Sequence, residues 1–177
     1  MKLLLSGLLL IITINSFGSS KLETVPFVDL DKYTGRWYEI ARYKNRFQRN
    51  CAGTMAEYSR EKNYISVKNS CQQLDDASEV DSSTGYATLV KDPSNAKLKV
   101  SFVPFFGKFG WFSGNYWIIE LGENYEYAVI GEPSRKYLWI LSRSKTLPES
   151  TYTEILNRLD TVHHYDTSKL FKSPTWL

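Results

Sequence analysis

The segment YEYAVIGEPSRKYLWILSR, residues 125–143, contains two runs of strand-forming residues with a short polar stretch between them. Aromatic and β-branched residues are frequent in both runs, 125–131 and 137–143, and such residues favour β-strands. The linking EPSRK contains proline and serine, which favour turns. The segment therefore predicts two adjacent antiparallel strands.

Six more runs of this kind precede the segment, with turn signals between them. They span residues 36–43, 51–59, 64–71, 85–90, 96–102 and 115–121. Eight strands in this arrangement predict an all-β fold, an eight-stranded antiparallel up-and-down β-barrel. Closing the sheet removes exposed strand edges, and a barrel of this size can hold one small ligand or fill with side chains.

The residue pattern changes from strand to helix after the last run. In LPESTYTEILNRLDTV, Pro148 and Glu149 are helix start signals, and the apolar residues that follow lie on one helical face. These residues are Tyr152, Ile155, Leu156 and Leu159. We therefore predict one C-terminal α-helix packed on the outside of the barrel.

The first twenty residues, MKLLLSGLLLIITINSFGSS, differ from the rest of the chain. Lys2 precedes an apolar run at 3–12, and small residues follow it, including Ser16 and Gly18. This order is typical of a secretory signal peptide, and the run is shorter than the roughly 20 residues of a membrane span. We predict a signal peptide at 1–20 and a single domain at 21–177.

The composition indicates a globular protein rich in aromatic side chains. The chain is 42% hydrophobic and 15% aromatic, with 12 Tyr, 9 Phe and 5 Trp. Its formal charge of +3 is mild, and no dense block of Lys and Arg occurs, so we expect no nucleic-acid partner.

The two cysteines, Cys51 and Cys71, lie in the second and third predicted strands. If the hairpin is centred on Glu61, Cys51 falls opposite Cys71, and Met55 faces Val67. Export permits a disulfide, which we predict for this pair. The alternative is two unpaired buried thiols.

Two motifs at the ends of the predicted barrel resemble the lipocalin family. YTGRWYEIARY carries Gly35-x-Trp37 on the first strand, and YLWILSR ends the last strand in Arg143, just before the helix. With LKVSFVPFF and YAVIGEPSRK, they look most like the group of bacterial lipocalin Blc and apolipoprotein D, over about residues 25–172. In lipocalins the tryptophan lies at the closed base of the barrel and the arginine packs across it. The resemblance implies a barrel that binds fatty acids or lysophospholipids, associated with the outer membrane and with lipid storage or transport for envelope maintenance. No cysteine follows the apolar run to carry a lipid, which favours a soluble periplasmic or secreted form.

Strand alternation and the resemblance together predict the residues that line the lumen. Trp37 points inward in lipocalins, so residues 39, 41 and 43 share its face, whereas Arg42 faces outward. Tyr116 matches a tyrosine of the family pattern. The predicted lumen residues are Glu39, Tyr43, Met55, Val67, Asn69, Tyr116, Tyr137 and Trp139. Ordinary core packing is the alternative for each ring, and Glu39 has either a structural role or a role in orienting the ligand.

The stretch VPFFGKFGWF, residues 103–112, falls in a loop at the open end of the predicted barrel. We predict that its rings, with Phe47, form a lid at the portal. These residues are Phe47, Phe105, Phe106, Phe109 and Trp111. The nearby basic residues Lys44, Arg46 and Arg49 could attract an anionic head group or a membrane surface. Two further partners are consistent with the sequence: a membrane surface in peripheral contact with the barrel, and a second copy of this chain in a homodimer.

Other classes of function find little support in the sequence. No nucleophile-elbow, zinc-protease, phosphate-loop or dinucleotide motif occurs, so we expect no enzyme. A lipid isomerase that uses a free lumen cysteine is one alternative, and a protein-interaction barrel that uses the aromatic rim is another. The two histidines, His163 and His164, follow the helix, so axial haem ligation is not expected, and no metal or other cofactor is expected either.

Overall fold

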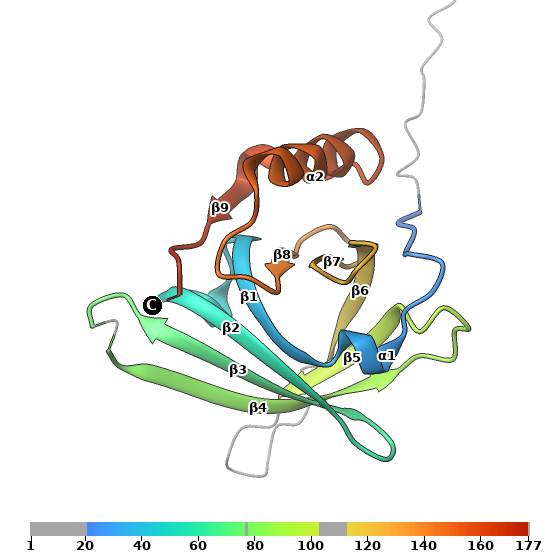
Figure 1. Cartoon of the computed structure of the whole chain (residues 1–177), viewed down its shortest axis with the longest axis horizontal. Coiled ribbons are helices and arrows are strands. Elements are labelled where there is room, and N and C mark those ends of the chain that lie inside the picture. The colour runs from blue at the N-terminus through green and yellow to red at the C-terminus, as the bar shows by residue number, and fades with distance from the viewer. Residues whose placement is uncertain (1–20, 77, 103–112, 177) are drawn as a thin grey trace, which may run out of the picture.

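The computed structural model of the chain describes residues 21–76, 78–102 and 113–176. Eight of its strands form an antiparallel barrel, in which each strand pairs with the next and β1 pairs with both β8 and β2 (Figure 1). They are β1 (Gly35–Tyr43), β2 (Cys51–Arg60), β3 (Ile65–Gln73), β4 (Val80–Leu89), β5 (Lys97–Phe102), β6 (Ser113–Leu121), β7 (Tyr127–Gly131) and β8 (Leu138–Ser142). The predicted eight-stranded barrel is confirmed.

One long helix, α2 (Glu149–Thr161), lies outside the barrel, as predicted. Its Tyr152, Ile155 and Leu159 are buried, and they belong to a cluster with outward-facing residues of β1, β6, β7 and β8. Leu156 packs against the same cluster while remaining partly exposed. No helix in the described ranges is long and apolar enough to cross a membrane.

A buried ionic group joins α2 to the outer face of the barrel. Glu120 of β6 accepts hydrogen bonds of 3.0 and 2.8 Å from the guanidinium of Arg158 on the helix. His163, which follows the helix, places its Nε2 3.2 Å from the other oxygen of Glu120. Both Glu120 and His163 are buried, so these contacts hold the helix in one position on the strands.

The structure also contains short elements that the sequence did not predict. These are α1 (Leu30–Tyr33), the 3₁₀ helices η1 (Arg46–Gln48) and η2 (Thr167–Lys169), and a ninth strand, β9 (Leu170–Lys172). The ladder of β1 with β2 ends at Tyr38, and from Ala41 onward β1 pairs with β9 instead. The C-terminal segment therefore forms the part of the wall that β2 leaves open.

Two bulges change the direction of side chains along the strands. The register of β1 with β8 shifts between Glu39 and Ala41, and that of β6 with β7 shifts between Ile118 and Glu120. An extra residue in a strand reverses the alternation beyond it. The side chains beyond each bulge therefore lie on the opposite face of the sheet from the one that strict alternation along the strand predicts.

Candidate functional site

The inner face of the barrel is the candidate site, and strand register identifies the side chains that line it. Residues directly opposite one another in a ladder share a face. Most of the inward residues form one buried cluster or pack against it, and nearly all of them are apolar or aromatic. They are Trp37, Ala56, Tyr58, Val67, Ala87, Leu98, Val100, Phe102, Tyr116, Ile118, Ala128, Ile130, Trp139 and Leu141. Such a lining suits a small apolar molecule.

The base of the barrel is closed by Trp37 and Arg143. The guanidinium carbon of Arg143 lies 3.8 Å from the centre of the fully buried indole ring. The same group donates to the backbone carbonyls of Lys32 at 2.6 Å and Arg36 at 2.9 Å. Gly35 has φ +91°, and a Cβ there would lie 3.3 Å from Arg143 Nη1. These contacts give the predicted residues a structural role at this end.

Three tyrosine hydroxyls meet just above this base. Tyr116 of β6 shares hydrogen bonds of 2.7 Å with Tyr33 of α1 and 3.0 Å with Tyr58 of β2. Burial raises the pKa of Tyr58 to about 12 and holds the pKa values of Tyr33 and Tyr116 well above their ordinary range. The predicted lumen residue Tyr116 thus has its hydroxyl engaged by neighbouring tyrosines.

The bulge in β1 overturns three of the predicted orientations, since Ala41, predicted to face inward, lies opposite Ile140 in the cluster beneath the helix. Arg42 lies opposite the inward-facing Trp139 of β8, so it faces inward and the expectation that it points outward was wrong. Tyr43 faces the helix instead of the lumen. Its ring packs against Tyr165 at 5.8 Å and its hydroxyl donates to the carbonyl of Asp166 at 2.8 Å. Glu39 precedes the shift and faces inward, as predicted.

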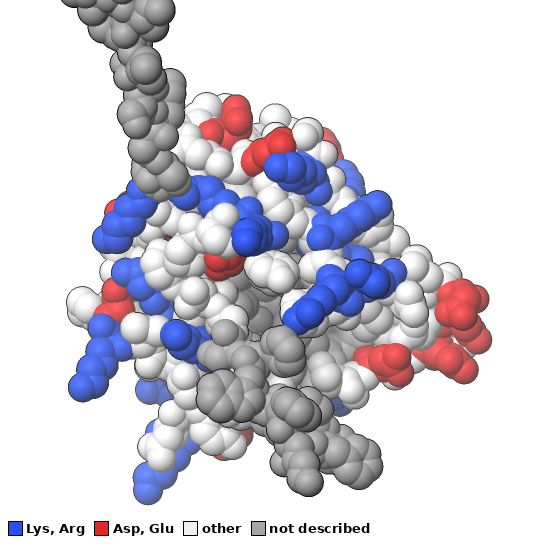
Figure 2. Space-filling view, turned by 180° about the vertical axis from the view of Figure 1, so that it is seen from behind, with Lys and Arg blue, Asp and Glu red and all other residues white. Residues whose placement is uncertain are grey.

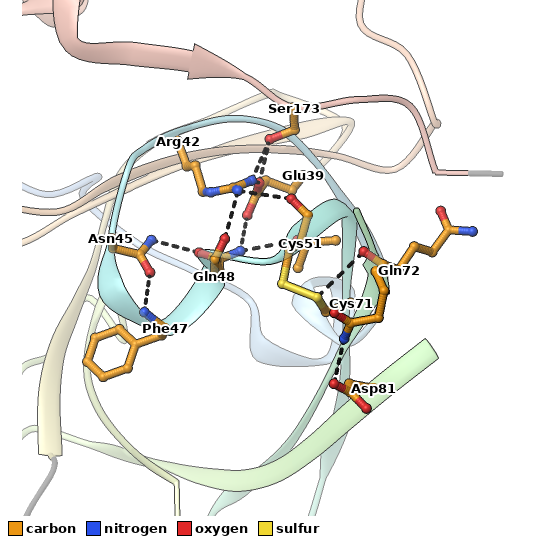
Figure 3. The surroundings of a disulfide bond; sticks show 12 residues. Glu39, Arg42, Asn45, Phe47, Gln48, Cys51, Cys71, Gln72, Asp81 and Ser173 are labelled. Atoms are coloured by element: carbon orange, nitrogen blue, oxygen red, sulfur yellow. Dashed lines mark hydrogen bonds and ion pairs between the residues drawn. A yellow bond between two sulfur atoms is a disulfide. The ribbon is translucent and has the colours of Figure 1, made fainter. Parts of the chain in front are cut away.

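Glu39 and Arg42 form an ion pair in which the Glu39 side chain is 2% exposed and the Arg42 side chain 4% (Figure 3). Ser173 donates to the same carboxylate oxygen, and Gln48 Nε2 donates to the other one at 2.6 Å. Gln48 Oε1 accepts from the indole of Trp139 at 3.0 Å. This set of five side chains, called the inner polar network below, links β1, η1, β8 and the C-terminal segment.

A row of aromatic rings extends from the inner polar network toward solvent. Tyr137 stacks on Trp139, with ring centres 5.8 Å apart and planes inclined by 4°. Phe47 lies 6.3 Å from Tyr137 and is 60% exposed. The structure therefore brings three of the predicted site residues together. The other predicted portal residues, Phe105, Phe106, Phe109 and Trp111, lie outside the described residues.

The cysteine pair forms the predicted disulfide, but the predicted strand register was wrong. Cys51 and Cys71 are bonded, with Cα atoms 5.3 Å apart. The turn is centred between Lys62 and Asn63 rather than on Glu61, so Thr54 lies opposite Cys71. The disulfide also removes the free thiol that a cysteine-based isomerase needs.

The new register reassigns the side chains of β2. Met55 lies opposite Ser70 and alternates with the inward-facing Ala56, so it faces away from the inner cluster and is not a lumen residue. Val67 lies opposite Tyr58 in the inner cluster, and Asn69 lies on the same face opposite Ala56. The predictions for Val67 and Asn69 therefore agree with the placement of their side chains.

Three exposed basic residues flank Phe47 in the sequence. Lys44, Arg46 and Arg49 are exposed, and the guanidinium of Arg46 lies 4.9 Å from the centre of the Phe47 ring. Lys44 Nζ lies 5.1 Å from the ring of Phe171 on β9. Figure 2 shows groups of Lys and Arg side chains on the face turned away from the viewer in Figure 1. This distribution suits contact with an anionic surface.

Sequence reasoning missed four residues of the site, namely Tyr33, Tyr58, Gln48 and Ser173. One available signal was Asp29, whose carboxylate caps α1 by accepting from the backbone N–H groups of Asp31 and Lys32 and so positions Tyr33. Gln48 and Ser173 belong to short irregular segments, where no periodicity predicts which way a side chain points.

Comparisons with a family model, with curated proteins and with solved structures all find similarity to lipocalins. A family model described as a lipocalin-like domain matches residues 28–175. Temperature-induced lipocalin-1 of Arabidopsis thaliana is 38% identical over 157 residues, which cover 87% of this chain and 83% of that protein. Outer membrane lipoprotein Blc of Escherichia coli K12 is 38% identical over 142 residues, covering 80% and 76%. Apolipoprotein D of Macaca fascicularis is 33% identical over 151 residues, covering 80% and 74%. Among solved structures, insecticyanin from the tobacco hornworm Manduca sexta matches with a TM-score of 0.69 and 25% identity, over 88% of this chain and 85% of that one.

Proposed function

Because this chain belongs to the lipocalin family, we propose that it binds a long-chain lipid, a fatty acid or a lysophospholipid, inside the barrel. The observation that carries this proposal is the inner face, which is mainly apolar and aromatic from Trp37 at the base to Trp139 near the inner polar network. A lipid tail needs such a lining, and its head needs a few polar groups at one end.

The proposed role is to store or carry that lipid rather than to transform it. The two cysteines are joined to each other, so the chain holds no free thiol for nucleophilic chemistry. The row of Phe47, Tyr137 and Trp139 gives a lipid a path from solvent to the inner face. The predicted portal role of the rings in 103–112 is part of the same proposal.

We place this activity outside the cytoplasm, in the periplasm or in secreted form. The apolar N-terminal segment with its small residues, and a disulfide, both suit an oxidising exported compartment. Four bacterial relatives are named outer membrane lipoproteins, which supports a role in maintaining envelope lipids and contact with a membrane surface. The exposed Lys44, Arg46 and Arg49 favour such contact with anionic lipids.

A matched pair of substitutions on β5 tests the site. Val100 faces inward, and its neighbour Lys99 faces outward and is exposed. Val100→Phe should fill the lumen and weaken binding of a lysophospholipid at least about tenfold, or about 1.4 kcal/mol. Lys99→Phe should leave it unchanged. The measurement is the quenching of tryptophan fluorescence during lipid titration, with native mass spectrometry to count bound lipid.

Two results would contradict lipid binding in the lumen. One is a wild-type protein that binds neither fatty acid nor lysophospholipid in either measurement. The other is a folded Val100→Phe variant that binds as tightly as the wild type. The exposed Phe47 favours one second candidate, a protein-interaction surface at the rim. That candidate predicts that Phe47→Ser abolishes a protein contact while lipid affinity is retained.

A further inference from the structure

The inner face carries a buried charged pair whose hydrogen-bonding groups are almost all in use. Among the buried residues of the described chain, five carry a carboxyl, guanidinium or imidazole group, and three of these, Glu120, Glu132 and His163, belong to the outer side or to the β7–β8 connection. The other two are Glu39 and Arg42, which lie on the inner face and neutralise one another (Figure 3).

The guanidinium of Arg42 is committed to protein groups on both terminal nitrogens. Nη1 donates to Glu39 and, at 3.1 Å, to Ser173, and Nη2 donates to the carbonyls of Gln48 at 3.1 Å and Cys51 at 3.3 Å. Its Nε is buried and has no hydrogen-bond partner among the described residues. Arg42 is therefore a cation with one buried donor to spare, but with its charge already balanced by Glu39.

The amide of Gln48, the half-buried part of the inner polar network, is also fully engaged. Its oxygen accepts from Trp139 at 3.0 Å and from Asn45 at 2.8 Å. Its nitrogen donates to Glu39 at 2.6 Å and to Thr54 at 3.2 Å. Within the described residues, the polar groups of the inner polar network are therefore paired with protein groups, apart from Arg42 Nε, and the network as a whole carries no net charge.

An anionic head group next to the inner polar network would have to displace Glu39 from Arg42, or else lie beside Glu39. In both cases the head group would lose its own hydration. Either step leaves a charge buried without a partner, which is costly, whereas an ester or hydroxyl loses much less on burial. We propose that Glu39 sets the head-group class of the ligand. The barrel accepts an acyl chain whose carboxyl group is esterified and discriminates against the free carboxylate. This inference rests on the proposed binding of a lipid in the lumen.

The test compares a monoacylglycerol with the free fatty acid of the same chain length, at a pH where the acid is ionised, by tryptophan quenching and by native mass spectrometry. We expect the wild type to bind the ester at least about tenfold more tightly, or about 1.4 kcal/mol. Glu39→Gln keeps the shape of the side chain and removes its charge, so Arg42 becomes available to the carboxylate. In this variant the preference should shift toward the free acid by about tenfold or more.

Two further variants keep the proposal open to refutation. Glu57→Gln removes a carboxylate that is 44% exposed and far from the inner polar network by register, so it should leave the preference as in the wild type. Double replacement of Glu39 and Arg42 by Gln restores neutrality, so this variant should again prefer the ester even where Glu39→Gln alone does not fold.

The outcomes separate this inference from the proposal on which it rests. If the wild type binds the free acid as tightly as the ester, or if Glu39→Gln folds and leaves the ratio unchanged, the role of Glu39 is refuted although lipid binding stands. If neither lipid binds the wild type, both proposals fail together.

Discussion

Reducing the disulfide should lower the free energy of unfolding of the barrel by an amount set by the length of the loop that the bond closes. The bond joins residues separated by 20 positions, at the start of β2 and near the end of β3. In the chain-entropy model a loop of this length gives about 3 kcal/mol, because the cross-link restricts the unfolded chain. For a protein of this size that loss lowers the melting temperature by about 6–12 °C.

The barrel should still fold without the bond. The β2–β3 ladder continues through eight paired positions, from Cys51 opposite Gln73 to Arg60 opposite Ile65, and the rest of the core does not depend on the sulfur atoms. The assay is urea unfolding of the wild type followed by tryptophan fluorescence, with and without a reductant. Near-ultraviolet circular dichroism in the absence of urea should show the same tertiary signal in both samples.

The control is a variant in which Cys51 and Cys71 are both alanine, since it should match the reduced wild type and be indifferent to reductant. A difference in unfolding free energy below about 0.5 kcal/mol would show that the chain-entropy account does not apply here. Complete unfolding on reduction would show that the core alone does not sustain the barrel.

Three other perturbations have outcomes set by single contacts. Gly131→Ala places a Cβ 2.4 Å from the hydroxyl of Tyr165, so we expect a loss of about 1–3 kcal/mol in thermal unfolding, whereas a Cβ on Gly114 has nothing within 4 Å and Gly114→Ala should cost far less. Burial raises the pKa of Tyr58 from its ordinary 10.0 to about 12, so its contribution to stability is complete below pH 10 and is lost as the pH rises toward 12. Urea unfolding across that range should show a falling free energy, and a flat profile would refute the assignment. Arg143→Ala removes the cation above the buried first-strand indole and three donors to carbonyls, so it should cost about 2 kcal/mol, part of which Arg143→Lys should recover.

The sequence was sufficient to predict the architecture, but not the face of the sheet on which each side chain lies. Runs of aromatic and β-branched residues, turn signals and one helical stretch predicted eight strands and α2 because these patterns repeat along the chain. A bulge has no such repeat. One extra residue near Ile40 reverses the direction of the side chains that follow in β1, which is why Ala41, Arg42 and Tyr43 were predicted on the wrong faces.

The hairpin shows a second limit of the same kind. A disulfide requires only that two Cα atoms come close, and both the predicted register and the observed one bring Cys51 and Cys71 together. The turn at Lys62 and Asn63, and the irregularity between Cys51 and Thr54, decide between them. Met55 therefore faces away from the inner cluster although the predicted bond is present.

The ninth strand has a consequence for how the protein is made. The later half of β1 pairs with β8 on one side and with β9 on the other, so its neighbours are separated from it by about a hundred residues or more. Contacts so distant along the chain form late, because large loops must close first. During synthesis this half-strand lacks its first neighbour until β8 has left the ribosome, and it lacks its second neighbour until β9 has followed about thirty residues later. Until both neighbours are present, this half-strand exposes apolar side chains and an unpaired edge, which are the features of a partly folded chain that favour misassociation.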